Sequence, residues 1–561
     1  MASAECVVDS QDHLGEGILW DDKEQALYWL DVPMPSKLHR WYPDSGKHQS
    51  WNMPEMITSM SVREQGGLLI ASHHGLNHFN FNDEGLVRIL EPEIDQPKNP
   101  EQVLSTMLDS IRHRGPDDRG SERISNVNGP TLHLGHQRFS IIDLSPRGHQ
   151  PMPNESKTLW ISTNSEIYNF RELREKLSPS FRFNSQSDTE VLLKSYEHWG
   201  LNCLEMIRGM FAFAIWDAKI QSLILVRDRL GIKPLYYLPL KNKFLFASEV
   251  RALLASGLSD TKINHSGLYH FLSFGHLKSP NTLIGNIQEL QPGYFLVINR
   301  DGNIDRKRYW NPCKSITSTN IHQTDPKTSI DQLLKEAVQY RQVSDVPIGA
   351  FLSGGIDSYI IMDYFTKNKR SCSTFTLGFE NKTYDESHHV FKIDKKIDKK
   401  IYKTTDSELK SNFLKIAKNL SDPIGDSSIL PTYIIHNKIK NHSNVCLSGD
   451  GGDEAFFGYI TFDAFYLARF IKKALPNFIL KILRKFFNLT KISYDYITLS
   501  TKLRRFFNSI HLEQKYLLSS WMSCLNSEDM SLLFKEKIDE NKIYDDLNNL
   551  FTKNRDMMKN S

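Results

Sequence analysis

Val346-Pro-Ile-Gly-Ala-Phe-Leu-Ser-Gly-Gly-Ile-Asp-Ser358 is the segment that best indicates how the C-terminal half of this 561-residue chain folds. A short apolar run, a glycine-rich turn and a predicted helix follow one another, which is typical of a nucleotide site in a parallel sheet. The glycines let backbone N–H groups approach a phosphate, and the serine hydroxyls add donors at the positive end of the helix. The stretch therefore predicts a phosphate-binding loop. It lacks the lysine of the G-x-x-x-x-G-K-S/T motif, which disfavours transfer of a γ-phosphoryl group.

A second glycine-rich loop, Ser448-Gly-Asp-Gly-Gly-Asp-Glu454, carries three carboxylates. Negative charges this close raise one another's pKa and reduce stability when no cation faces them. We therefore expect magnesium or the ammonium group of a substrate opposite this loop.

Further motifs follow one another in the middle of the chain. They are His113-Arg-Gly-Pro-Asp-Asp118, Leu134-Gly-His-Gln-Arg-Phe-Ser-Ile-Ile-Asp143, Gly148-His-Gln-Pro151, Asn164-Ser-Glu-Ile-Tyr-Asn169, Ser187-Asp-Thr-Glu190, Gly209-Met-Phe-Ala-Phe-Ala-Ile-Trp-Asp217 and Arg227-Asp-Arg-Leu-Gly-Ile-Lys-Pro-Leu-Tyr-Tyr237. In this order they resemble the class II glutamine amidotransferase domain of glutamine-dependent asparagine synthetases. The resemblance implies an α/β/β/α sandwich of the N-terminal-nucleophile type over residues 99–312.

The C-terminal part resembles the synthetase domain of the same family. The resemblance rests on the two loops above and on Phe375-Thr-Leu-Gly-Phe379, Tyr384-Asp-Glu-Ser387 and Asp422-Pro-Ile-Gly-Asp-Ser-Ser428. It implies a doubly wound α/β ATP-pyrophosphatase domain over residues 325–561 that ends in helices. The whole chain is therefore predicted to be a multidomain protein with α+β and α/β parts.

The resemblance also implies roles for individual residues of the synthetase half, with ATP and Mg²⁺ as cofactors. Asp357 is the candidate magnesium ligand. Asp450 would act in forming a β-aspartyl-AMP intermediate and, with Asp453, would face the aspartate substrate; Ser427 and Ser428 are weaker candidates for that pocket. ATP binding is assigned to Leu352, Ser353, Gly354, Gly355, Ile356, Asp357, Ser358, Leu377, Gly378, Ser448 and Gly449.

In the amidotransferase half the resemblance implies a glutamine pocket. Arg138 would hold the α-carboxylate of glutamine and Asp188 its α-ammonium group, with Glu166 alongside. Asn164 would donate to the oxyanion of the tetrahedral intermediate. The family's Asn-Gly-Glu is Asn164-Ser-Glu166 in this sequence, and the added Cβ of Ser165 is expected to crowd this site.

The sequence departs from the family at both ends. The family's nucleophile is a cysteine exposed at the mature N-terminus, but no Cys-Gly-Ile segment occurs here, and Cys6 would become terminal only after removal of five residues. We therefore expect glutamine hydrolysis to be absent or very weak. We also expect part of the nucleotide site to be missing, because the sequence ends before the family's late phosphate-contacting lysine.

Three interpretations of the function follow. The first is ATP-dependent amidation of aspartate to asparagine, with ammonia favoured over glutamine as the donor. The second is the same chemistry on a sugar or other carboxylate in polysaccharide synthesis. The third is a catalytically silent product of gene fusion and truncation.

Residues 1–98 form a different kind of segment. Hairpin patterns at Gly17–Asp31 and Leu38–Gly46 resemble the opening of the senescence marker protein/gluconolactonase (regucalcin-like) family, which are six-bladed β-propellers that hydrolyse sugar lactones with one divalent metal. Only Glu16 matches a metal ligand of that family, so we expect no lactonase activity. Because two blades leave apolar faces and strand edges uncovered, we expect this segment to be poorly ordered.

The composition excludes several classes of protein. The overall net charge is +3, and the excess of +7 after residue 380 is spread over 181 residues, which is too dilute for a nucleic-acid-binding surface. No run of 18 uncharged apolar residues and no basic leader occurs, so we expect a cytoplasmic protein that acts on small molecules, without a membrane or nucleic-acid partner. A homodimer is left open. The six cysteines lack metal-binding spacing.

Overall fold

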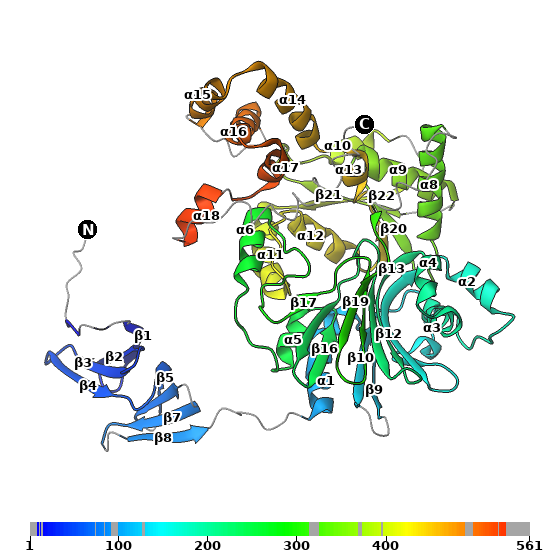
Figure 1. Ribbon diagram of the computed structural model, residues 1–561. Helices are drawn as coiled ribbons and strands as arrows, with labels where there is room; N and C mark the ends of the chain where they lie inside the picture. Colours follow the sequence, from blue (N-terminus) through cyan, green and yellow to red (C-terminus); the bar gives the residue numbers. More distant parts are fainter. Residues whose placement is uncertain are drawn as a thin grey trace. The chain divides into compact units, whose positions relative to one another are not determined.

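The structure is a computed structural model, and its contacts divide the chain into two compact units, Met1–Asn99 and Pro100–Ser561 (Figure 1). The residues that it describes are 8–10, 12, 15–64, 66–72, 75–82, 85–90, 99–125, 130–312, 325–368, 373–393, 397–488, 498–525 and 527–534. Cys6, Cys313 and Cys372 lie outside these ranges. Each unit is described by itself.

The N-terminal unit consists of two antiparallel four-stranded sheets, each with its strands in sequence order. The first contains β1 (Gly15–Asp21), β2 (Ala26–Asp31), β3 (Lys37–Tyr42) and β4 (Lys47–Asn52). The second contains β5 (Ile57–Val62), β6 (Leu68–Ser72), β7 (Gly75–Asn80) and β8 (Gly85–Leu90). This is the four-stranded blade pattern that the sequence predicted.

Alternation along these strands directs one apolar face of each sheet into a shared core. Tyr28, Leu30 and Leu38 of the first sheet are fully buried with Leu68 and Ile70 of the second. The two blades therefore cover one face of each other in the described residues. The expectation that this segment is poorly ordered stays a prediction, and slow amide exchange across residues 17–31 would contradict it.

The larger unit begins with the predicted sandwich. A six-stranded sheet has the order β11-β12-β13-β14-β18-β19, and it faces a second layer made of the sheets β10-β9 and β16-β15-β17. The strands of the first sheet are β11 (Met152–Pro153), β12 (Leu159–Ile167), β13 (Gly209–Asp217), β14 (Ser222–Arg227), β18 (Tyr294–Ile298) and β19 (Ile304–Arg308). Those of the second layer are β9 (Asp118–Ile124), β10 (Leu132–Arg138), β15 (Tyr236–Leu240), β16 (Lys243–Ala247) and β17 (Gln288–Glu289).

Helices cover the outer faces of both layers. Apolar side chains of α2 (Phe170–Leu177), α3 (Asp188–Trp199) and α4 (Cys203–Met206) pack on the six-stranded sheet. Side chains of α1 (Pro100–Ser110) and α5 (Val250–Ala255) pack on the opposite layer. The three cores separate four layers, which confirms the α/β/β/α sandwich.

The next part of this unit has a parallel sheet of order β22-β21-β20-β23. Its strands are β20 (Ile348–Phe351), β21 (Ser373–Phe379), β22 (Asp398–Thr404) and β23 (Val445–Leu447). Helices α8 (Pro326–Tyr340) and α9 (Ile356–Asn368) pack on one face, and α12 (Ile429–Ile439) packs on the other. The doubly wound fold is confirmed. The strand order reverses between β20 and β23, where such sheets bind ligands.

The remaining helices complete the description. Around the sheet lie α10 (Ser387–Phe391), α11 (Asp406–Asn419) and α13 (Gly452–Phe456), and α6 (His265–Phe274) belongs to the preceding domain. The chain ends in α14 (Ile460–Ala474), α15 (Asn477–Asn488), α16 (Leu499–Ser509), α17 (Gln514–Met522) and α18 (Ser527–Phe534). Among the described residues, no helix is long and apolar enough to cross a membrane.

Candidate active sites

The predicted phosphate loop lies between β20 and the start of α9. The hydroxyl of Ser358 lies 3.0 Å from that of Ser353 and donates to the carbonyl of Gly355 at 3.1 Å. Gly354 has φ +92°, and a Cβ there would lie 2.8 Å from the Cβ of His389. The loop therefore requires glycine at this position.

The acidic loop packs directly against the phosphate loop. A Cβ on Gly449 would lie 2.7 Å from the backbone nitrogen of Ser358. A Cβ on Gly452 would lie 2.7 Å from the carboxylate of Asp357. The phosphate loop follows β20 and the acidic loop follows β23. The structure therefore brings together two motifs that are far apart in the sequence, at the switch point where the strand order reverses.

The carboxylates of the acidic loop have different neighbours. Asp450 accepts a hydrogen bond from the Ser448 hydroxyl at 2.9 Å, whereas Glu454 accepts one from the Tyr459 hydroxyl at 2.5 Å. Asp453 lies over Gly458, where a Cβ would approach its Oδ1 to 2.0 Å. Within the part of the chain that the structure describes, no three His, Cys, Asp or Glu side chains are grouped to hold a metal.

The other predicted ATP residues lie directly after β20, on β21 and at the start of α9. The Leu352 amide donates to the Phe375 carbonyl at 3.0 Å, and the Thr376 hydroxyl donates to the Leu352 carbonyl at 2.6 Å. Gly378 lies beside Asp385, whose carboxylate would be 3.1 Å from a Cβ on this glycine. Leu377 and Ile356 belong to β21 and α9, and Ser427 precedes α12.

In the amidotransferase half, Arg138 is buried at the end of β10. Its guanidinium donates to three backbone carbonyls, those of Ile142 (3.4 Å), Asp143 (2.5 Å) and Ser145 (3.1 Å). A Cβ on Gly148 would lie only 1.9 Å from its Nη2. The loop thus fixes the side chain that the resemblance assigns to the glutamine carboxylate.

Buried Asp188 and half-buried Glu166 form an acidic pair near this arginine. Asp188 is at the start of α3 and accepts a hydrogen bond from the Ile167 amide at 3.0 Å. Burial raises the pKa of both carboxyls; Asp188 further raises the pKa of Glu166, which Lys233 lowers. Such a pair favours a proton or a ligand ammonium between its members. Asn164 lies on β12 two residues before Glu166.

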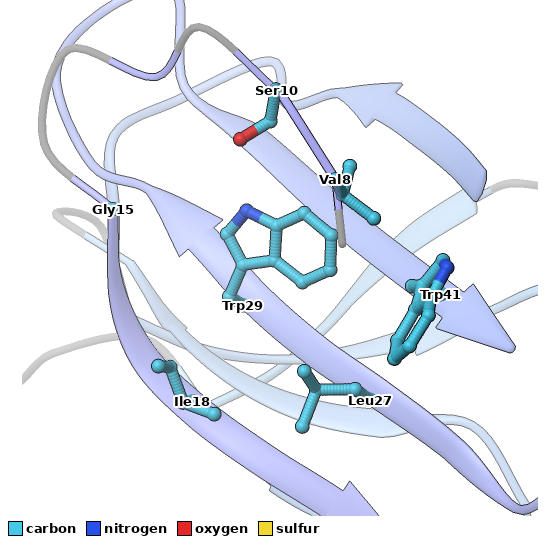
Figure 2. A pocket seen from close by; sticks show the side chains of 7 residues that line it. All are labelled: Val8, Ser10, Gly15, Ile18, Leu27, Trp29 and Trp41. Atoms are coloured by element: carbon cyan, nitrogen blue, oxygen red, sulfur yellow. The ribbon is translucent and has the colours of Figure 1, made fainter. Parts of the chain in front are cut away.

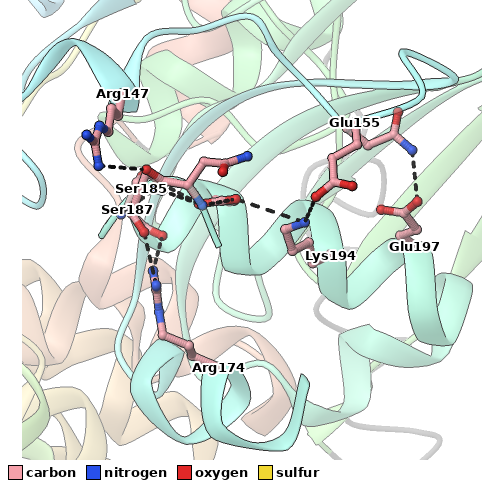
Figure 3. Close-up of polar contacts among 10 residues, drawn as sticks. Arg147, Glu155, Arg174, Ser185, Ser187, Lys194 and Glu197 are labelled. Atoms are coloured by element: carbon pink, nitrogen blue, oxygen red, sulfur yellow. Dashed lines mark hydrogen bonds and ion pairs between the residues drawn. The ribbon is translucent and has the colours of Figure 1, made fainter. Parts of the chain in front are cut away.

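The segment before Asp188 is held by a polar network (Figure 3). Arg174 donates to the carbonyls of Ser185 (2.9 Å) and Ser187 (3.4 Å). Glu190 accepts from the amide and hydroxyl of Ser185, both at 2.7 Å, and Lys194 lies 4.0 Å from it. These contacts set the position at which α3 begins and therefore the position of Asp188.

The acidic pair predicts a pH-dependent stability. The raised pKa values mean that the folded chain keeps these protons to a higher pH than the unfolded chain does. The free energy of unfolding therefore falls as pH rises towards 8. Glu166→Gln should therefore raise the melting temperature relative to the parent at pH 8, by about 2–4 °C for each kcal/mol, and much less at pH 5. Scanning calorimetry measures this difference. The exposed Glu175→Gln is the matched control, and an equal difference at both pH values would contradict the prediction.

The described cysteines do not supply a nucleophile near Arg138. Cys203 is buried in the core between sheet and helices, and burial raises the pKa of its thiol to about 12. Cys446 lies on β23, and Cys524 is exposed just after α17.

A charged junction that sequence reasoning missed joins the two halves of the larger unit. Glu249 accepts hydrogen bonds from His113 (2.9 Å) and Arg114 (3.0 Å), and it forms an ion pair with Arg251, whose Nε lies 2.8 Å from its carboxylate. The amide of Arg251 in turn donates to the hydroxyl of Ser421 at 3.1 Å. His113 and Glu249 are 136 positions apart, so no local pattern could have paired them.

The N-terminal unit has a small hollow of about 240 Å³ on the first sheet (Figure 2). Beside it, Asp12 accepts from Trp29 Nε1 at 2.7 Å and lies 3.2 Å from His39. The backbone of Glu16 pairs with Leu30 on β2. The residues lining the hollow are Val8, Ser10, Gly15, Ile18, Leu27, Trp29 and Trp41, and none of them is a predicted catalytic or ligand-binding residue.

Comparisons with known proteins match each part. Residues 88–310 match the glutamine amidotransferase domain family and residues 329–546 the asparagine synthase family. A "Putative asparagine synthetase 2 (glutamine-hydrolyzing)" of Methanocaldococcus jannaschii is 36% identical over 402 residues, which cover 67% of this chain and 76% of the relative. The chain belongs to the asparagine synthetase family. This confirms the assignment made from the motifs.

Two further relatives show how much of the family this synthetase-like chain covers. Asparagine synthetase 1 (glutamine-hydrolyzing) of Bacillus subtilis is 36% identical over 374 residues, and the match covers 65% of this chain but 57% of that protein. Amidase chry2 of Gibberella zeae is 36% identical over 261 residues, or 46% of this chain and 38% of its own. Residues 14–101 match the SMP-30/gluconolactonase/LRE-like region, as the hairpin patterns predicted.

Proposed function

We propose that the chain catalyses ATP-dependent amidation of aspartate to asparagine with ammonia as the nitrogen donor. The observation that carries the proposal is the packing of the acidic loop against the phosphate loop at the switch point of the parallel sheet, with Asp357 between them. Family membership supports the use of ATP.

The chemistry proceeds in two steps. A side-chain oxygen of aspartate attacks the α-phosphorus of ATP, the bond to the β-phosphate breaks and pyrophosphate leaves. Ammonia then attacks the activated carboxyl carbon, which releases AMP and gives the amide. Activation is required because a carboxylate is a poor electrophile at neutral pH.

The chain's own residues provide positioning and charge. Backbone N–H groups of the loop from Ser353 to Ser358 would hold the phosphates. Asp450 and Asp453 would face the aspartate substrate. Asp357, half-buried beside the phosphate loop, has the oxygen donors that Mg²⁺ prefers, and the bound ion would offset charge on the departing pyrophosphate.

We further propose that the amidotransferase half binds glutamine without hydrolysing it. Arg138 and the pair of Asp188 and Glu166 are present, but the thiol of Cys203 is buried in an apolar core. A thiol with a raised pKa is a poor nucleophile.

The test is a comparison of nitrogen donors. We expect purified full-length protein to release pyrophosphate with ATP, Mg²⁺, aspartate and ammonium, and to give neither pyrophosphate nor glutamate above background when glutamine replaces ammonium. Coupled assays for both products measure this. Glutamate release blocked by a thiol reagent would contradict the second proposal and implicate a cysteine outside the described residues, such as Cys6.

A second acceptor class is tested in the same assay. Amidase chry2, which matches part of this chain, is named for other chemistry. If ammonium supports no turnover with aspartate, pyrophosphate release with uronic acids would favour a sugar carboxylate as the acceptor. No release with either acceptor would favour a catalytically silent protein.

A further inference from the structure

The loop that holds Arg138 also holds the segment before Asp188. The carboxylate of Asp143 accepts from the Ser145 amide at 3.0 Å and from the Gln186 amide at 2.7 Å. Its own carbonyl accepts from Arg138. One buried residue therefore links the two groups expected to bind the carboxylate and the ammonium of an α-amino acid.

The same loop is joined to the synthetase half by a reciprocal pair of hydrogen bonds. The Asp143 amide donates to Oδ2 of Asp345 at 2.8 Å, and the Asp345 amide donates to the Ile141 carbonyl at 3.0 Å. Asp143 has φ +55°, in the left-handed region that few residue types adopt readily.

Asp345 lies shortly before β20, the strand that leads into the phosphate loop. Gly349 and Ala350 of this strand are buried, and it pairs with β21 on one side and β23 on the other. Beyond β20 the chain continues through Leu352 into the phosphate loop at Ser353. The backbone of this one strand therefore links the contact between Asp143 and Asp345 to the phosphate loop.

We propose that Asp345 is a positioning residue that couples α-amino-acid binding at Arg138 and Asp188 to the geometry of the phosphate loop. The proposal rests on the proposed function, because it requires both sites to bind their ligands. It goes beyond that function by giving an unhydrolysed amino acid a regulatory effect on nucleotide binding. By linkage, the effect on the two affinities is equal.

Calorimetric titration of the full-length protein tests the coupling. Glutamine is titrated with and without α,β-methylene-ATP and Mg²⁺. In the parent protein we expect the nucleotide to tighten glutamine binding at least about fivefold, the lower end of typical allosteric coupling. Asp345→Ala should reduce this factor to less than about twofold, because the acceptor for the Asp143 amide is lost.

Two variants separate positioning from general structure. Asp345→Asn keeps an acceptor oxygen and should retain coupling close to that of the parent. Tyr340→Phe removes another contact between the same halves, the 2.8 Å hydrogen bond to Glu172, and should leave coupling unchanged.

The outcomes are distinct. If the parent binds neither ligand, the proposed function fails and the coupling fails with it. Binding of both ligands without coupling in the parent overturns the role of Asp345 alone, as does coupling that survives Asp345→Ala. If the alanine variant does not fold, loss of coupling in the folded asparagine variant also overturns the proposal.

Discussion

Asp357→Ala is expected to reduce pyrophosphate release with ATP, aspartate and ammonium at least about 100-fold, which corresponds to about 2.7 kcal/mol of transition-state stabilisation. The carboxylate lies between the two loops, against Gly452, where it can hold a cation beside the phosphates. Loss of that cation would leave the charge on the departing pyrophosphate without compensation. A continuous pyrophosphate assay measures the rate.

The control for this prediction is Asp331→Asn. Asp331 lies on α8 and accepts a hydrogen bond from Tyr364, away from both loops, so we expect nearly parental rates. A parental rate in Asp357→Ala would remove this residue from the proposed magnesium site. If both variants lose activity and melt early, the cause is a change in fold rather than lost chemistry.

Gly148→Ala is expected to weaken glutamine binding at least about 30-fold, or about 2 kcal/mol. Its Cβ would lie 1.9 Å from Nη2 of Arg138, so the guanidinium would have to leave the three carbonyls that now hold it. An arginine displaced in this way could not donate two parallel hydrogen bonds to the carboxylate of glutamine. Calorimetric titration with glutamine measures the affinity.

The matched control is Gly285→Ala. A Cβ at Gly285 meets only the Lys262 carbonyl, at an ordinary distance of 3.6 Å, so we expect parental affinity. The synthetase half provides an internal check, because ammonium-dependent turnover should survive Gly148→Ala. Unchanged glutamine affinity in Gly148→Ala would show that Arg138 does not hold the ligand.

The pyrophosphate assay and the glutamine titration report on different halves of the larger unit. A protein that releases pyrophosphate with ammonium but does not bind glutamine would be an ammonia-dependent synthetase whose amidotransferase half serves only as a scaffold. A protein that releases pyrophosphate and also binds glutamine would retain the amino-acid pocket without its chemistry. The coupling experiment on Asp345 distinguishes an inert pocket from a regulatory one.

Much of the fold was predictable from short segments. An apolar run followed by glycines and a helix start has few structural solutions, so the parallel sheet and the loop from Ser353 to Ser358 followed from local pattern. The sandwich was predicted from motif order. The N-terminal strands were predicted from hairpin patterns, but the core that the two sheets share was not, because period-two alternation does not reveal how completely two short sheets cover each other.

The motifs of the chain were enough to assign the family, the order of its domains and the residue types available for chemistry. Which of these residues lie together depends on the folded chain: Asp357 with Gly452, Glu166 with Asp188, and Asp143 with Asp345. The reason is physical. Backbone propensity and hydrophobic period act over a few residues, whereas the desolvation, close approach and hydrogen bonding that define these sites depend on partners brought together by packing of whole sheets and helices.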